Sequence, residues 1–98
     1  MSSDQKFTTI TSTGQVKTIS GGSTDLGPAR ITYIQCEGVA SSKLILRDGT
    51  SGSGDKVFEA DFGTEGLDIY VPGNGIRFTT GVHATITNTS SVTLGYTG

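Results

Sequence analysis

The clearest pattern in the chain lies near its end, where residues 82–97 read VHATITNTSSVTLGYT. Two runs in this stretch alternate apolar and polar residues, and their apolar positions are Val82, Ala84, Ile86, Val92, Leu94 and Tyr96. Successive side chains of a β-strand point to opposite faces, so this period of two predicts two strands with one apolar face each. The linker 88–91, NTSS, consists of turn-forming residues and predicts a hairpin.

The same alternation continues toward the N-terminus as far as residue 30. It predicts five more short strands, at residues 31–36, 43–47, 56–62, 67–71 and 76–78. The turn sequence PGNG at 72–75 separates the last two of these. No helix longer than one turn is expected, because the chain is rich in Thr, Ser and Gly.

The first 29 residues are less regular. Residues 6–12 and 15–20 predict two strands that are rich in Thr and poor in large apolar groups. They fit either edge strands or an arm that becomes ordered by pairing with a neighbouring subunit. The domain organisation is therefore predicted as an N-terminal arm or edge-strand segment, 1–29, and a core, 30–98.

Seven to nine short strands with regular turns predict one all-β domain, an antiparallel β-sandwich of jelly-roll type, with a small barrel as the alternative. A chain of 98 residues is long enough for a single core. The largest inward side chains should meet in one dry layer between two sheets, and they are Phe58, Phe62, Ile69, Phe78, Ile86 and Leu94.

Charge and cysteine content narrow the function classes. The net charge is -2 and no basic run is present, so neither nucleic acid nor a membrane surface is an expected partner. Cys36 is the single cysteine and cannot form an intramolecular disulfide. No stretch has the apolar character of a secretory signal or a membrane span, which predicts that the chain is made in a cytoplasm.

The glycine-rich loop 48–56, DGTSGSGDK, has two functional interpretations and one structural one. A phosphate-binding loop would need lysine where Asp55 stands and a following helix. A calcium site would use the carbonyl and hydroxyl oxygens between Asp48 and Asp55, but the loop lacks the closely spaced carboxylates of a dedicated calcium site. The favoured interpretation is a mobile loop between two strands.

Catalytic groupings are absent from the sequence pattern. Glu59 and Asp61 share one face of a predicted strand, but exposed acids explain them equally well. His83 lies on a Thr-rich face without a metal-binding partner, and Cys36 lacks an activating base. We therefore expect no enzyme activity, no metal and no cofactor.

The remaining candidates are contact residues. Tyr33, Tyr70 and Tyr96 could stack on sugar rings, with Thr and Asn side chains supplying hydrogen bonds. Tyr33 and Tyr70, together with the outward-facing His83 and Thr85, are the predicted interface or ligand contacts.

Over a little more than half of its length, from Lys43 to Gly98, the chain resembles small virion proteins of tailed bacteriophages, particularly marine ones. The resemblance rests on LILRDGTS at 44–51, KVFE at 56–59, LDIYVPGNGIRF at 67–78 and TGVHATITNTSSVTL at 80–94. It implies a structural part of the particle, such as a capsid decoration or cement protein, or a small component of the tail or neck. The implied partners are the major capsid protein or a tail protein.

Composition and resemblance together predict a non-enzymatic virion protein that binds the shell and itself, as a homo-oligomer for which a trimer is one form. A carbohydrate- or receptor-binding β-sandwich module is the alternative. Loss of particle stability on deleting the gene would favour the first, and a saturable glycan signal that depends on Tyr70 or Tyr33 would favour the second.

Overall fold

The computed structural model describes residues 5–97, which form nine strands and one 3₁₀ turn. The strands are β1 (Lys6–Ile10), β2 (Gly14–Gln15), β3 (Ala29–Cys36), β4 (Lys43–Asp48), β5 (Asp55–Asp61), β6 (Leu67–Tyr70), β7 (Ile76–Phe78), β8 (Val82–Thr87) and β9 (Val92–Thr97). The 3₁₀ turn η1 covers Gly63–Glu65. Within the part of the chain described here, no helix is long and apolar enough to cross a membrane.

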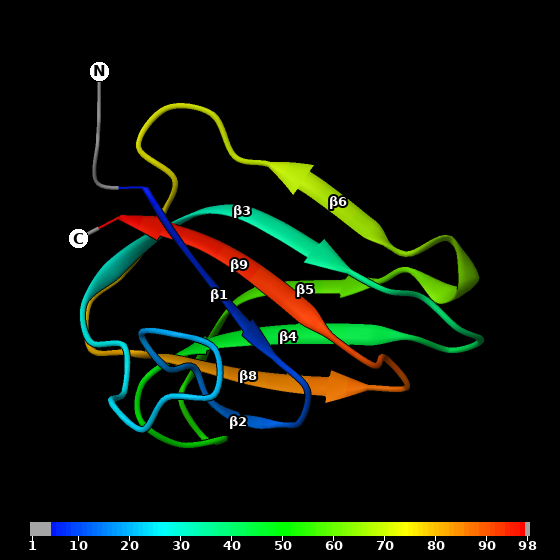
Figure 1. Cartoon of the computed structure of the whole chain (residues 1–98), viewed down its shortest axis with the longest axis horizontal. Helices are drawn as coiled ribbons and strands as arrows, with labels where there is room; N and C mark the ends of the chain where they lie inside the picture. Colours follow the sequence, from blue (N-terminus) through cyan, green and yellow to red (C-terminus); the bar gives the residue numbers. More distant parts are fainter. Residues whose placement is uncertain (1–4, 98) are drawn as a thin grey trace.

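The strands form two antiparallel sheets that face each other (Figure 1). Sheet A has the order β1-β9-β3-β6, and β7 also pairs with β3, beside β6. Sheet B has the order β2-β8-β4-β5. The prediction of an all-β antiparallel sandwich is therefore confirmed.

The pairing follows the rule of a jelly roll. The first strand pairs with the last, β2 pairs with β8, β3 pairs with β6 and β7, and β4 pairs with β5. The chain is thus one long hairpin with its tip at residues 49–54, and successive pairs of strands alternate between the two sheets. The loop 71–75 divides a single strand position into β6 and β7, so nine strands fill eight positions.

The predicted hairpin at 82–97 is wrong. β8 pairs with β4 and β2 in sheet B, whereas β9 pairs with β3 and β1 in sheet A, so residues 88–91 cross from one sheet to the other. Asn88 has a φ of 55°, and its carbonyl oxygen accepts a hydrogen bond from the Ser42 hydroxyl. Asn and Ser stabilise a turn of either kind, so turn chemistry alone does not identify the strands that it connects.

The core lies between the sheets, as the alternation predicts. Phe78 and Leu94 are fully buried in it, and Phe58, Phe62 and Ile86 pack against it from partly buried positions. Ile69 differs from the prediction, because it is only half-buried and lies outside this cluster. It belongs to β6, an edge strand of sheet A, where fewer neighbours cover it.

The N-terminal segment contributes an edge strand to each sheet, β1 to sheet A and β2 to sheet B. Val16 and Leu26, which follow these strands, are buried in the core. The strand predicted at 15–20 is wrong in extent, since β2 ends at Gln15. The chain then turns back on itself, where Lys17 bridges to Asp25 through both a backbone pair and an ion pair.

Candidate binding surface

A row of aromatic side chains crosses the outer face of sheet A. The strand register places Phe7 of β1 opposite Gly95 of β9, Gly95 opposite Tyr33 of β3, and Tyr33 opposite Tyr70 of β6. Each of these residues has an inward-facing neighbour in its own strand, so the row points away from the core. We call Phe7, Tyr33 and Tyr70 the aromatic row.

Gly95 allows the aromatic rings on either side of β9 to come into contact. Because glycine has no side chain, the ring of Phe7 reaches across β9 and meets the Tyr33 ring edge to face, with centroids 6.0 Å apart and planes at 75°. A Cβ atom at Gly95 would lie 2.9 Å from Phe7 Cε2 and 3.0 Å from Tyr33 Cβ. Gln5 Nε2 would lie closer still, at 2.6 Å, so the glycine in the middle of this strand is explained by side chains that crowd this position from both sides.

The aromatic row is largely open to solvent. Phe7 is 55% exposed and Tyr70 is 71% exposed, which is unusual for large apolar side chains gathered on one face. The hydroxyl of Tyr33 donates a 2.6 Å hydrogen bond to Asp68 Oδ1, and this bond raises the pKa of Tyr33. The row is therefore a fixed, exposed platform of the kind that binds a partner or a ring-shaped ligand.

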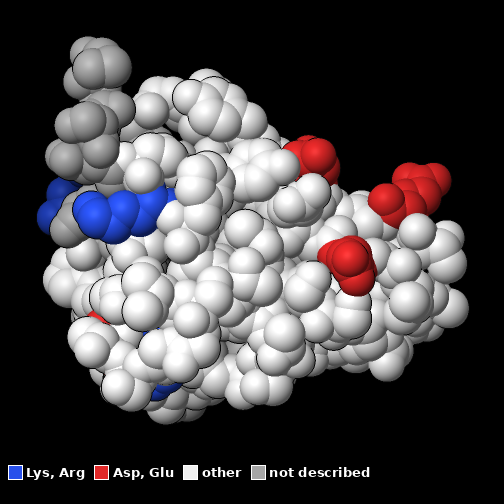
Figure 2. All heavy atoms as spheres, in the orientation of Figure 1, with Lys and Arg blue, Asp and Glu red and all other residues white. Residues whose placement is uncertain are grey.

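Charged residues flank the aromatic row on its two sides. On one side, Arg30 of β3 lies directly opposite Arg77 of β7, an arrangement of like charges that is unfavourable by itself. Among residues 5–97, neither arginine forms an ion pair with an acidic side chain. On the other side lie Asp68 and, farther along, Glu37, both exposed. In the view of Figure 2, the largest area of Lys and Arg lies on the left and most of the Asp and Glu surface lies on the right.

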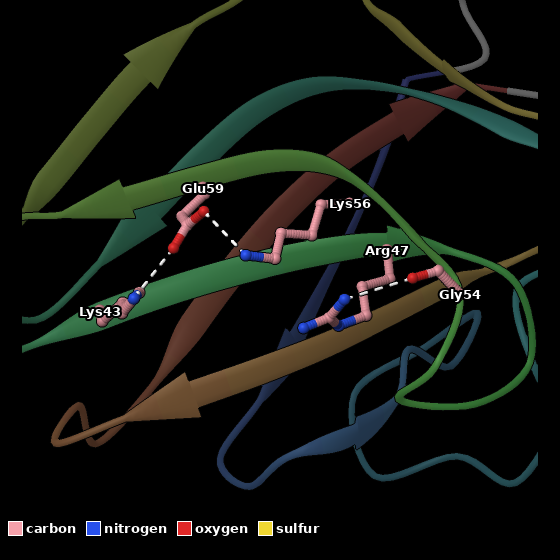
Figure 3. Close-up of polar contacts among 5 residues, drawn as sticks. All are labelled: Lys43, Arg47, Gly54, Lys56 and Glu59. Atoms are coloured by element: carbon pink, nitrogen blue, oxygen red, sulfur yellow. Dashed lines mark hydrogen bonds and ion pairs between the residues drawn. The ribbon is translucent and has the colours of Figure 1, made fainter.

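The carboxylate of Glu59 is ion-paired on the outer face of sheet B. Glu59 of β5 accepts from Lys43 at 2.9 Å and from Lys56 at 3.4 Å, as Figure 3 shows. The two lysines, Lys43 first, lower the pKa of Glu59, so this carboxylate stays ionised and ion-paired. A general acid needs a raised pKa, and Glu59 therefore does not have the properties of an acid catalyst beside Asp61.

The loop 49–54 folds over a row of polar side chains on sheet B. Gln15 Nε2 donates to the carbonyl oxygen of Gly49 at 2.8 Å. Arg47 Nη1 donates to the carbonyl oxygen of Gly54 at 3.2 Å, as Figure 3 shows. His83 lies between Gln15 and Arg47 in the register and is half-buried. These contacts tie the loop at both ends to the sheet below it.

Asp48 holds a turn and is not arranged as a ligand. Its carboxylate accepts from Thr79 N and Oγ1 at 2.9 and 2.8 Å, from Thr80 N at 2.9 Å and from Gly81 N at 3.4 Å. The backbone bond from Thr79 is the largest cause that lowers the pKa of Asp48 to about 2, against a partial desolvation that raises it. Within residues 5–97, no three His, Cys, Asp or Glu side chains gather to hold a metal ion.

Two further candidates lie in the core. Burial raises the pKa of the Cys36 thiol to about 12, so its thiolate is not formed near neutral pH. Tyr96 is only 4% exposed, and its hydroxyl donates to the carbonyl oxygen of Thr18 at 2.7 Å. Tyr96 is therefore unable to stack on a sugar ring, and that part of the prediction is wrong.

The four predicted contact residues separate into two pairs. Tyr33 and Tyr70 lie side by side on the outer face of sheet A, while His83 and Thr85 lie on β8, on the outer face of sheet B. Sequence reasoning missed Phe7, because the run around it is rich in Thr, and it missed Gly95. A glycine inside an otherwise regular strand was the available signal of a close approach.

Comparison with known proteins leaves the surface to be interpreted from its own geometry. The chain matches no protein-family model, no curated protein and no solved structure.

Proposed function

We propose that this chain is a non-enzymatic structural protein of a tailed-phage particle, a decoration or cement protein that binds the shell and itself. The observation that carries the proposal is the aromatic row on the outer face of sheet A, in which Phe7 and Tyr70 are exposed and Tyr33 lies half-buried between them. Large exposed aromatic side chains bounded by charges are typical of protein docking surfaces.

The side chains that could take part in catalysis or metal binding support the same proposal, because each has a structural role. Glu59 is ion-paired with two lysines, Asp48 holds the turn at 79–81, and Cys36 is buried in the core. A jelly roll also serves shell proteins and lectins alike, so the fold is compatible with the proposal without deciding it.

Co-sedimentation with phage particles that lack the protein tests the proposal. We expect wild-type chain to pellet with the particles, and the double variant Phe7→Ser/Tyr70→Ser to remain in the supernatant. Val57→Ser is the matched control, since Val57 is also an exposed apolar residue but lies on β5 of sheet B. Failure of the wild-type chain to bind heads or tails contradicts the proposal, and labelled electron microscopy of intact particles distinguishes the two locations.

Glycan binding is the second candidate, and a small pocket beside Tyr70 favours it. The pocket has a volume of about 280 Å³ and is lined by Gln5, Arg30, Thr32, Tyr70, Gly73, Asn74 and Thr97. An exposed ring beside amide, hydroxyl and guanidinium groups suits a sugar, which presents an apolar ring face and a rim of hydroxyl groups. A glycan array with a saturable signal that Tyr70→Ala abolishes and Val57→Ala preserves would favour this candidate over cement.

A further inference from the structure

The outer face of sheet A has a charge pattern that complements itself. We infer that this face pairs with the same face of a second copy of the chain, across a two-fold axis that runs along the aromatic row. The inference rests on the self-association that the proposed function includes, and it specifies the surface, the partner and the symmetry.

The order of side chains along the strands is the first step. Asp68 lies two residues from Tyr70 on β6, or about 7 Å along the strand. Arg77 lies on β7, on the opposite side of the aromatic row, at the level of Arg30, roughly 7 to 10 Å away. The acidic and basic groups are therefore at similar distances from the row, on opposite sides of it.

The strand positions are the second step. β6 and β7 occupy the same side of β3, since both pair with it while β9 pairs with its other side. Asp68 and Arg77 thus lie on one line that runs past Tyr70. A rotation by 180° about the aromatic row exchanges the two ends of this line and turns the face over.

The charges then decide among three face-to-face arrangements. With the axis along the aromatic row, Asp68 of each copy faces Arg77 of the other, and Tyr70 meets Tyr70. With an axis along β6 and β7, parallel to the strands, Arg77 would face Arg77 and Asp68 would face Asp68, which is repulsive. With a parallel axis through the middle of sheet A, β6 and β7 would face β1 at the opposite edge, and Asp68 would lie over the uncharged Thr9. Only the first arrangement is self-complementary in the manner of an isologous dimer.

The second copy also supplies acidic partners that the two arginines lack among the residues the structure describes. Arg30 and Arg77 lie opposite each other without an acidic partner among residues 5–97, and Asp68 is exposed, with one of its oxygens bonded to Tyr33. Facing sheets pack about 10 Å apart, a separation that an arginine and an aspartate side chain can span. When Asp68 of one copy meets Arg77 of the other, the paired arginines gain an opposite charge and the exposed rings are covered.

The size of the face sets the expected strength. Four strand positions about 4.8 Å apart and a strand length of about 20 Å make a face of roughly 400 Å² per copy, or roughly 800 Å² in total. This area is below that of a standard stable interface, so we expect a weak dimer, with a dissociation constant on the order of 10⁻⁵ to 10⁻⁴ M. The dimer and the shell use the same aromatic row, so the dimer must dissociate before the row binds the shell.

Two complementary charge reversals test the inference. Sedimentation velocity at increasing concentration should show a monomer–dimer equilibrium for the wild-type chain. Asp68→Arg alone and Arg77→Asp alone should each weaken the dimer by about tenfold or more, because each places like charges opposite each other twice in a homodimer. An equimolar mixture of the two variants should restore dimers to within about threefold of the wild type, since every facing pair is then opposite in sign.

Asp55→Arg is the matched control, because Asp55 is an exposed acid on β5 of sheet B, and it should leave the wild-type equilibrium unchanged. Far-UV circular dichroism verifies that each variant is folded. If one reversal does not fold, Tyr70→Ser replaces it and should weaken the dimer, and higher salt should weaken the wild-type dimer as well.

Three results would overturn the inference. The first is a wild-type chain that stays monomeric up to about 1 mM, ten times the largest dissociation constant expected here. The others are a mixture of the two reversals that stays monomeric and a trimer that is insensitive to both reversals. A monomeric chain that still binds phage particles would remove the two-fold dimer and leave the proposed function standing. A dimer that responds to the reversals as expected but binds no particle would contradict the proposed function and leave the two-fold dimer standing.

Discussion

Asp48 offers the sharpest test of how this fold is held together, through the substitution Asp48→Asn. The carboxylate at the end of β4 accepts four hydrogen bonds from residues 79–81, the turn that leads into β8. An asparagine retains one acceptor oxygen but presents its amide hydrogens to donors. The turn should therefore lose its attachment to β4, and the free energy of unfolding should fall at neutral pH.

The lowered pKa gives the size of this effect and its pH range. The native pKa of Asp48 is about 2, against an ordinary value of 3.8, a difference worth about 2 kcal/mol when fully expressed. Because this side chain is partly exposed, screening reduces the contribution to about 1 kcal/mol. The folded state binds fewer protons than the unfolded state between these values, so the contribution is complete above about pH 4 and is lost as the pH falls toward 2.

Denaturant unfolding at pH 7, 4, 3 and 2, followed by far-UV circular dichroism, measures this contribution. We expect Asp48→Asn to be less stable than the wild type by about 1 kcal/mol at pH 7 and the difference to shrink toward pH 2. Asp55→Asn is the control, since Asp55 lies opposite Asp48 in the register and is exposed. A stability difference that is absent at pH 7, or that is unchanged at pH 2, refutes the assigned role of the carboxylate.

Two further substitutions and one thiol-labelling experiment test the core and the aromatic row. Phe78→Ala should lower the free energy of unfolding by about 3–5 kcal/mol because Phe78 is fully buried, whereas Val57→Ala at an exposed site should cost about 0.5 kcal/mol or less. Equal losses of stability in thermal unfolding would contradict the placement of Phe78 in the core. Gly95→Ala should push the Phe7 ring from Tyr33 and cost about 1 kcal/mol, seen as loss of the NMR contact between the rings; an unchanged contact would rule this out. Cys36 should react with a thiol reagent at pH 8 only after denaturant is added, and rapid labelling of the native chain would show that it is accessible.

The alternation of apolar and polar residues was sufficient to locate the strands. Each run predicted between residues 31 and 97 corresponds to a strand, from β3 to β9, and the inward positions Phe78 and Leu94 are buried as expected. Ile69 shows where this reasoning stops, because periodicity identifies the inward face but not whether the strand lies at an edge.

Only the tertiary structure decided which strands pair. Both β8 and β9 have an apolar face, and that face can be buried by pairing them in one sheet or by placing them in opposite sheets across the core. The crossover at 88–91 satisfies local turn preferences as well as a hairpin does. The choice depends on contacts distant in sequence, such as Phe7 with Gly95, which no local pattern contains.

The sequence by itself thus determined the strand positions from residue 31 onward and most of the inward faces, because each of these follows from local spacing and side-chain chemistry. The tertiary structure alone decided that Tyr33 and Tyr70 share a face with Phe7, and that His83 and Thr85 lie on the opposite face of the sandwich. Binding surfaces arise where strands remote in the chain become neighbours, and that neighbourhood is set by the packing of the whole domain.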